Sequence, residues 1–475
     1  MQSLSEFDQA SIRSYTQIAL TFPLAQGTST TAVIQHLRSS LARLGEKIPF
    51  LAGRVRLRKT RFGEEAYISP GNTGDIPLRI AILAGQQFNV AEVVGSSYAK
   101  LAARGFPAHA FVHPALDLND DFKIEEKPVP VAHVRVSVVT GGIILLLSLH
   151  HTAGDGYSLQ LFADSFAAAT RRERIPGENL SLGLKLPNEQ RPYSATLLDL
   201  SRTCPEFNIL LNPNSSPGLA DTLPGGSSIS AIPKTGKIFV FDFGRLQKLR
   251  DMVYMVSGPE TTRPTVFACL AAFTWAHVTR ARLKSEVGFA PKHEDSNEAK
   301  LFIPVDFRRQ FSNETGAYFG NAVVTVPIQA SVSEVESACD ARNLKPLATL
   351  LAKVAATISG VDKAAVLRRE DLFRRIGDCR RLVLRQDRRL PGQLQFNTWR
   401  FMGGDTSWNL PGVGTKKKPD SVRRIQGDLS IGNALILPGR SESKVYELFL
   451  QIPTISMELL LEDMDWMQWV EKVVG

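Results

Sequence analysis

Two adjacent histidines, His150 and His151, end a strongly apolar run, and Asp155 and Gly156 follow after three intervening residues. A neutral imidazole, with an ordinary pKa of about 6.5, can accept a proton at cellular pH. His151 is therefore a candidate general base, which would remove a proton from a hydroxyl or an amine. The competing interpretation is a hydrogen-bonded histidine of the core. Asp155 could hold the imidazole in one tautomer, or it could pair elsewhere and fix the turn, and we favour the turn.

The residues around this motif predict the elements that position it. Residues 134–149 first alternate and then become almost wholly apolar, which predicts a central strand buried on both faces. Gly154 and Gly156 mark a turn, and residues 157–166 take up helical spacing. The two histidines therefore lie at the end of a central strand, where α/β sheets usually hold ligands. Because side chains alternate along a strand, only one of the two can face a given cleft.

The pattern His-x-x-x-Asp-Gly at His151, Asp155 and Gly156 resembles the motif of the BAHD acyl-CoA-dependent acyltransferases, especially their fungal relatives around the trichothecene acetyltransferases. Other patterns of that family occur in the family's order. They are Leu-Ser-x-x-Asp, Pro-x-Leu-Ala-Gly-Arg, an Ala-x-x-Trp helix, Thr-Arg-Ala-Arg, Val-Asp-x-Arg, Tyr-Phe-Gly-Asn and Thr-Ser-Trp, at residues 4–8, 49–54, 265–276, 279–282, 305–308, 318–321 and 406–408. The resemblance covers essentially the whole chain.

The resemblance implies an α/β fold with two similar mixed-sheet domains of the chloramphenicol-acetyltransferase-like kind. It also implies an active-site channel between them, which CoA enters from one side and the acceptor from the other. A passage rich in Pro, Ser and Gly lies in mid-chain and predicts a long connection. We therefore expect an N-terminal domain over 1–190, a crossover loop over 191–234 and a C-terminal domain over 235–475.

The activity that the resemblance implies is transfer of an acyl group from acyl-CoA to a hydroxyl, or less readily an amine, of a small-molecule acceptor of secondary metabolism. His151 would deprotonate the acceptor, which attacks the thioester directly. Thr406 and Trp408 would donate hydrogen bonds to the developing oxyanion, as such a reaction requires. Thr265 and Asn321 are the expected contacts to the acyl-CoA co-substrate.

Two residues receive supporting roles: Gly156 leaves room for substrate beside the base, and Arg308 is structural. The resemblance pairs Arg308 with the acid of a later Asp-Phe-Gly-Trp-Gly motif, but residues 409–419 are shortened and lack that acid. Arg308 would then need another acid, for which Asp405 and Asp420 are candidates, or the contact between Arg308 and this part of the chain would be weakened. An unpaired buried charge costs about 3–5 kcal/mol.

Two alternatives to this activity follow from the same residues. The doubled histidine with Asp-Gly also resembles the motif of peptide-synthetase condensation domains, which share this fold. The degenerate late motif permits a non-catalytic relative. Against both stand the retained His151, Asp155, Thr406 and Trp408 and the absence of a carrier-protein segment.

Composition sets broader limits on the partners. The chain has 475 residues, 43% hydrophobic and 22% charged, as an ordinary globular protein does. The net charge of +9 suits anionic partners such as a phosphorylated co-substrate, and no nucleic-acid module pattern accompanies it. The four cysteines have no metal or disulfide spacing, so we expect no metal. No signal peptide or membrane-spanning run is evident, so we expect a cytoplasmic monomer.

Overall fold

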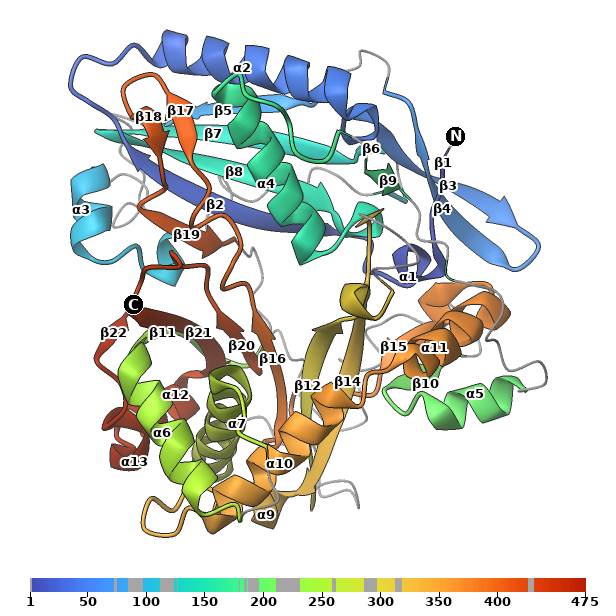
Figure 1. The fold of residues 1–475 in the computed structure, drawn as a ribbon, viewed down its shortest axis with the longest axis vertical. Helices are drawn as coiled ribbons and strands as arrows, with labels where there is room; N and C mark the ends of the chain where they lie inside the picture. The colour runs from blue at the N-terminus through green and yellow to red at the C-terminus, as the bar shows by residue number, and fades with distance from the viewer. Residues whose placement is uncertain are drawn as a thin grey trace.

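The computed structural model describes residues 2–71, 75–83, 97–111, 124–125, 127–178, 180–182, 186, 196–210, 231–258, 262–285, 297–311, 318–425 and 431–475. Two mixed sheets organise these residues, one above the other in Figure 1. The α/β class and the two mixed sheets that the sequence predicts are confirmed.

The first sheet has five strands in the order β19-β2-β8-β7-β5. Its strands are β19 (Ser421–Arg424), β2 (Tyr15–Pro23), β8 (Gly142–His150), β7 (Ala132–Val139) and β5 (Leu78–Ile82). Every residue of β8 is buried, which explains its continuous apolar run. β8 runs antiparallel to β2 and β7, whereas β5 and β7 are parallel.

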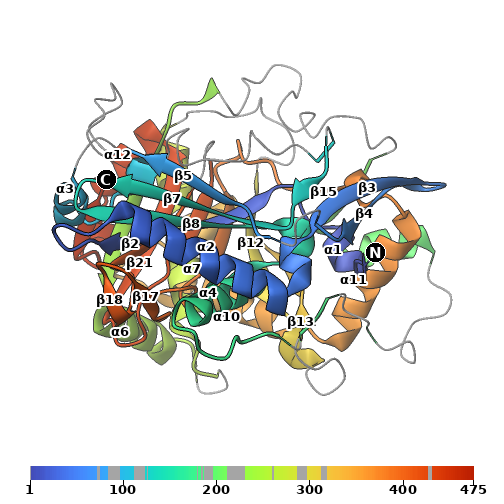
Figure 2. The same ribbon diagram turned by 90° about the horizontal axis from the view of Figure 1, so that it is seen from above.

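Two helices cover this sheet, α2 (Thr30–Lys47) and α4 (Gly156–Thr170), and they pack against each other (Figures 1 and 2). α2 buries Val33, Leu37, Leu41 and Leu44, the helical stripe that its sequence shows. α4 starts directly after the histidine turn, so its N-terminus lies at the end of the central strand.

The second sheet has seven strands in the order β14-β12-β16-β20-β21-β11-β22. These are β14 (Val323–Ser331), β12 (Glu298–Asp306), β16 (Gln393–Thr398), β20 (Asn433–Ile436), β21 (Val445–Pro453), β11 (Lys234–Asp242) and β22 (Lys472–Val474). The helices packed with it are α6 (Phe243–Met255), α7 (Val266–Ser285), α10 (Lys345–Ser359) and α12 (Thr454–Leu461). The pairs β12–β16 and β16–β20 are parallel, and the other pairs are antiparallel.

The late part of the chain crosses back to the first sheet. After β16 come the hairpin β17 (Trp408–Leu410) and β18 (Gly414–Lys417), and then β19, which pairs antiparallel with β2. Residues inside the range expected for the second domain therefore complete the first sheet. The hairpin stands where the family motif is shortened.

Smaller elements fill the edges. They are helices α1 (Glu6–Gln9), α3 (Tyr98–Ala103), α5 (Leu197–Thr203), α9 (Val332–Ser337), α11 (Lys363–Ile376) and α13 (Met464–Met467), and strands β1 (Gln2–Ser3), β3 (Arg54–Thr60), β4 (Gly63–Ser69), β6 (Val129–Pro130), β9 (Ser181–Leu182), β10 (Phe207–Ile209), β13 (Tyr318–Phe319) and β15 (Leu382–Leu384). α1 lies beside α11 in both views. α5 and β10 belong to the expected crossover, most of which lies outside the described residues.

No helix in the described part of the chain is long and apolar enough to span a membrane. The same residues contain no group of His, Cys, Asp and Glu arranged to hold a metal ion.

Candidate active site

The two histidines occupy different surroundings, as strand alternation requires. His150 is buried and packs edge-on against Tyr15, with ring centroids 5.1 Å apart. Burial, together with the nearby charges of His151 and Arg13, lowers the pKa of His150 to about 3. His151 begins a short 3-10 turn and is only partly buried. Of the pair, His151 is therefore the histidine whose side chain is not enclosed by the core.

Asn321 contacts His151 twice and fixes the tautomer of its ring. The Asn321 Nδ2 group donates to the His151 carbonyl at 2.7 Å and to Asp8 Oδ1 at 2.9 Å. Both partners are acceptors, so the amide orientation is determined, and Asn321 Oδ1 is the atom 3.1 Å from His151 Nδ1. A carbonyl oxygen accepts only, so Nδ1 carries the proton. In the neutral ring the lone pair then resides on Nε2.

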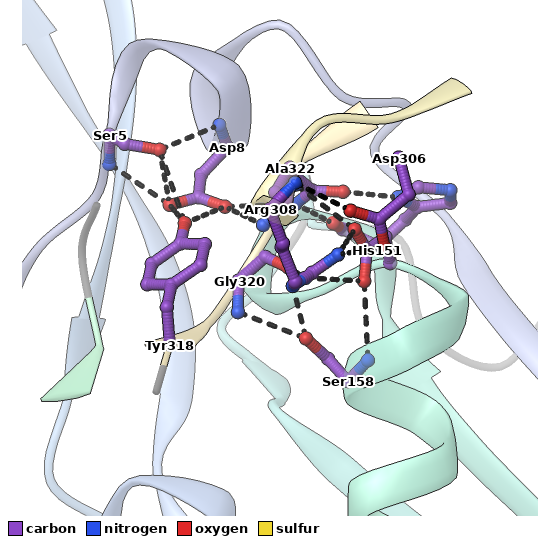
Figure 3. A network of polar contacts seen from close by, with 11 residues as sticks. Ser5, Asp8, His151, Ser158, Asp306, Arg308, Tyr318, Gly320 and Ala322 are labelled. Carbon is purple, nitrogen blue, oxygen red and sulfur yellow. Dashed lines mark hydrogen bonds and ion pairs between the residues drawn. The ribbon is translucent and has the colours of Figure 1, made fainter. Parts of the chain in front are cut away.

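Asp8 anchors Asn321 from the opposite end of the sequence. Its carboxylate is fully buried and accepts from Asn321 N at 2.7 Å, Ser5 Oγ at 2.7 Å, Ser5 N at 3.0 Å and Tyr318 Oη at 3.2 Å (Figure 3). Burial raises the pKa of Asp8, and the hydrogen bonds from Asn321 and Ser5 oppose that rise. The N–H donors of Ser5 and Asn321 favour the ionised carboxylate and so act against burial.

Asp155 lies away from the imidazole and holds the turn together. Its carboxylate accepts from Ser158 N at 3.2 Å as the N-cap of α4, and from Ala322 N at 3.0 Å. Arg308 adds two hydrogen bonds of 2.9 Å, one to each carboxylate oxygen. The Asp155 side chain thus joins α4 to the backbone that presents Asn321.

Arg308 has partners other than those the sequence suggested. Besides Asp155 it donates to Asp306 Oδ2 and to the Gly320 carbonyl, both at 2.8 Å. Burial would lower the pKa of the Arg308 guanidinium, but the carboxylates of Asp155 and Asp306 outweigh burial and raise it. Of the two alternatives, Arg308 therefore finds another acid, but its acids are Asp155 and Asp306 and not the candidates Asp405 or Asp420.

Those two acids are engaged elsewhere. Asp405 pairs with Lys418 at 2.7 Å, and Asp420 accepts from the Tyr98 hydroxyl at 2.7 Å. The carboxylate at the start of α4 already reaches Arg308, so the shortened motif does not leave this charge unpaired.

The predicted oxyanion donors have surroundings that the prediction did not foresee. The Thr406 hydroxyl donates to Asp164 Oδ1 at 2.6 Å. Trp408 is fully buried against Phe22 and Phe166, and its indole N–H has no partner among the described residues. Their part in acyl transfer stays a prediction.

Gly156 and Thr265 occupy helix starts. A Cβ atom at Gly156 would overlap the Met402 methyl group and would lie 3.9 Å from Trp399 Nε1. The space that this glycine leaves is therefore bordered by a loop of the late chain. Thr265 is exposed, and its hydroxyl caps α7 by accepting from Ala268 N at 3.1 Å.

A protein-family model described as the Transferase family matches residues 2–358, which is well over half of the chain. The chain belongs to the Transferase family. The predicted resemblance to BAHD enzymes and the predicted transferase class are thereby confirmed.

Individual relatives of this Transferase family member are distant in sequence. It is 24% identical to acyltransferase easC of Emericella nidulans over 294 residues, which cover 59% of this chain and 58% of that protein. The match thus spans little more than half the length of that relative. Identity to the trichothecene 8-O-acetyltransferase of Fusarium sporotrichioides is 23% over 512 residues, covering 99% and 97%.

The fold is shared with a solved structure, TRI101 of F. sporotrichioides complexed with coenzyme A and T-2. The TM-score is 0.77 at 18% identity, and the match covers 100% of this chain and 99% of that one. At this identity the likeness establishes the fold alone.

For this Transferase family member, sequence reasoning missed the partners of His151. It treated Asp8 as a family marker and Asn321 as a contact to the co-substrate, and the structure places both in the network behind His151. The contact of Asn321 to the co-substrate stays a prediction. One signal was available. The spacing Ser5-x-x-Asp8 is a capping box, which predicts a helix that begins after Ser5 but not the burial of Asp8.

Proposed function

We propose that this chain transfers an acyl group from acyl-CoA to a hydroxyl of a small-molecule acceptor of secondary metabolism, with His151 as general base. The fixed tautomer of His151 is the observation that supports this most directly, because it leaves Nε2 free to accept a proton. The activities after which two relatives are named, acyl transfer and trichothecene 8-O-acetylation, fit the same class.

The reaction needs one proton acceptor and no covalent enzyme intermediate. His151 Nε2 takes the acceptor's hydroxyl proton as the oxygen attacks the thioester carbonyl. The tetrahedral intermediate then expels the CoA thiolate, which recovers the proton from the imidazolium. A positioned base of this kind contributes about 10²–10⁴-fold to rate.

Asn321 and Asp155 serve this step without touching substrate. Asn321 accepts from Nδ1–H and so also stabilises the transient imidazolium. Asp155 and Arg308 hold α4 against the backbone of residues 320–322, which keeps Asn321 in place. Such fixed geometry avoids reorganisation during the reaction.

The acyl-CoA co-substrate is expected near the start of α7. Thr265 is exposed there, at the N-terminus of a 20-residue helix. A helix N-terminus favours anionic groups such as phosphates. Thr265 is therefore the proposed contact, and the net charge of +9 favours the same polyanion.

The test uses the purified chain, acetyl-CoA and a panel of hydroxylated metabolites that includes T-2. Acylated product is detected by mass and free CoA by its thiol. We expect His151→Ala to lower kcat at least a hundredfold while CoA affinity and melting temperature stay unchanged. The matched control is His109→Ala, which removes an exposed histidine.

Three outcomes would contradict the proposal. Full activity in His151→Ala would show that His151 is not the general base. Transfer only from a carrier-protein thioester would favour the condensation reaction. A wild-type chain that neither binds nor turns over any acyl-CoA would favour the non-catalytic relative.

A further inference from the structure

One stripe of α4 faces the late segment of the chain. Gly156, Gln160 and Asp164 are spaced four residues apart and so lie on one side of the helix. All three contact residues 399–406, which connect β16 to the β17–β18 hairpin. One continuous face of α4, the helix that begins beside His151, thus packs against this segment.

Hydrogen bonds fasten the segment to that stripe. The Asp164 carboxylate accepts from Thr406 Oγ1 at 2.6 Å and from Gln160 Nε2 at 2.7 Å. Gln160 Oε1 in turn accepts from Gly403 N, and Gln160 Nε2 lies 3.4 Å from Thr406 Oγ1. We call Gln160, Asp164, Gly403 and Thr406 the latch.

Just before the latch, the segment borders the active-site turn. The Met402 methyl lies where a side chain at Gly156 would begin, and Trp399 Nε1 lies 3.9 Å from the same point. Trp399 and Met402 pack on the hydrophobic core of the first sheet. The surface that they present beside Gly156 is therefore largely apolar, which suits an acyl chain better than a polyhydroxylated acceptor.

We propose that the latch holds Met402 against Gly156 and thereby limits the length of the acyl group that the site admits. This inference rests on the proposed function. Gln160, Asp164 and Thr406 are then positioning residues, and Met402 determines acyl specificity. The Thr406 proton is given to Asp164, so Thr406 acts through Asp164 rather than by donating to an oxyanion.

The first experiment is a double-mutant cycle with Thr406→Val and Asp164→Ala. Dissociation constants for acetyl-, butyryl-, hexanoyl- and octanoyl-CoA are measured by calorimetry, with kcat and KM wherever an acceptor is turned over. Each single variant should shift the octanoyl-to-acetyl affinity ratio about tenfold toward the longer chain. The double variant should shift it no further.

Two further variants isolate the latch. Thr406→Ser retains the hydroxyl and should restore the wild-type ratio. Thr349→Val is the matched control, because it removes a hydroxyl that bonds only within α10. A general loss of stability would not be reversed by Thr406→Ser. Loss of a threonine hydroxyl elsewhere, as in Thr349→Val, would not change the chain-length preference.

The second experiment removes Met402 itself. Met402→Ala should tighten binding of the longer acyl-CoAs by about fourfold for each methylene that enters the released space, from about 0.8 kcal/mol per buried CH₂. Met402→Leu, of similar volume, should keep the wild-type preference.

Failure of this inference is separable from failure of the proposed function. Wild-type binding and transfer with an unchanged chain-length ratio in every variant would overturn the latch but leave the proposed function intact. A hundredfold fall of kcat in Thr406→Val alone, equal for all chain lengths, would instead make Thr406 an oxyanion donor. A wild-type chain that binds no acyl-CoA would overturn both.

Discussion

Asn321 connects the chemistry of His151 to a buried carboxylate, because its amide can satisfy Asp8 and the His151 carbonyl in only one orientation. Replacing it with alanine removes the acceptor at Nδ1 and lets the ring adopt either tautomer. We expect Asn321→Ala to lower kcat about tenfold, since one hydrogen bond contributes about 1 kcal/mol. The KM for acyl-CoA should change little.

Asn343→Ala is the control for this measurement, because Asn343 is exposed and its side chain accepts only from Lys345 N. A kcat unaffected by Asn321→Ala would mean that the tautomer is set by another group. An effect confined to KM would return Asn321 to the co-substrate contact predicted from the sequence.

Asp155 should matter more for stability than for the chemical step. In Asp155→Asn an NH₂ group replaces one acceptor oxygen and faces donors from Arg308, Ser158 or Ala322. Breaking a buried pair costs about 3–5 kcal/mol. Urea unfolding should show a loss of this size.

The control for Asp155 is Asp306→Asn, which removes the solvent-exposed partner of the same arginine. Asp306 is 46% exposed at its side chain, so its loss should cost only about 0.2–1 kcal/mol. If Asp155→Asn abolished transfer with an unchanged unfolding midpoint, Asp155 would be acting on the imidazole instead.

At this scale the sequence indicated the types of residue but not their contacts. The spacing of His151, Asp155 and Gly156 predicted a base at a strand end, and strand alternation implied that only one histidine of the pair could face a given cleft. It could not pair Asp8 with Asn321 or Asp155 with Arg308, because the residues in each pair are separated by more than 150 positions. Only the packing of both sheets brings them together.

Among the elements, β19 pairs with the first sheet through its backbone and contacts the second sheet through one side chain, Arg423. The Arg423 guanidinium is buried and donates to Glu447 of β21 at 2.8 and 3.0 Å. It also donates to the carbonyls of Phe106 at 2.8 Å and Gly105 at 3.0 Å. Arg423 therefore joins β19 to the second sheet and to the segment after α3.

We expect Arg423→Met to lower the free energy of unfolding by about 3–5 kcal/mol, since it leaves Glu447 and two carbonyls without their donor. Differential scanning fluorimetry and urea titration would both report the loss. Arg58→Met, which removes an exposed pair with Glu65, should change stability by less than about 1 kcal/mol. Equal losses of stability in the two variants would show that Arg423 does not hold β19 to the second sheet.

Element boundaries followed the sequence where periodicity was strong and failed where the chain departs from its relatives. The helix after the histidines was predicted within a few residues. The single central strand predicted over residues 134–149 was wrong, because this run folds back on itself as most of β7, a turn and β8, which pair antiparallel. The hairpin at 408–417 was not predicted, because its turn depends on backbone with positive φ at Gly412, Gly414 and Lys416. Nor did any sequence pattern indicate that β19, which lies within the range expected for the second domain, would pair with β2 in the first sheet.

For the whole molecule, buried histidines predict a loss of stability in mild acid. Burial, reinforced by nearby Arg79, Arg135 and His150, lowers the pKa of His133 to about 3, close to that of His150. The unfolded chain binds protons at these histidines below about pH 6.5, whereas the folded chain does not. Stability is therefore complete above that pH and falls as the pH decreases toward 3.

Because of these two histidines, the free energy of unfolding should fall by about 3 kcal/mol between pH 6.5 and pH 5, measured by urea unfolding at each pH. Substituting His150 with Gln should make the dependence shallower by about half, even if the variant is less stable at pH 7.5. A flat profile over this range would contradict the buried, neutral state of both rings.

The crossing of β19 also dictates the order in which a growing chain can be completed. β2 lies within the first 23 residues, yet the strand that covers its edge ends at Arg424. During synthesis, β2 therefore presents an unpaired edge until almost nine-tenths of the polypeptide has left the ribosome. Exposed edges recruit other strands, so the nascent N-terminal half is a natural client for chaperones and a poor candidate for expression alone. A synthetic peptide that spans β17–β19, added during refolding of such a half, should suppress its aggregation by taking the place that the absent strand would fill.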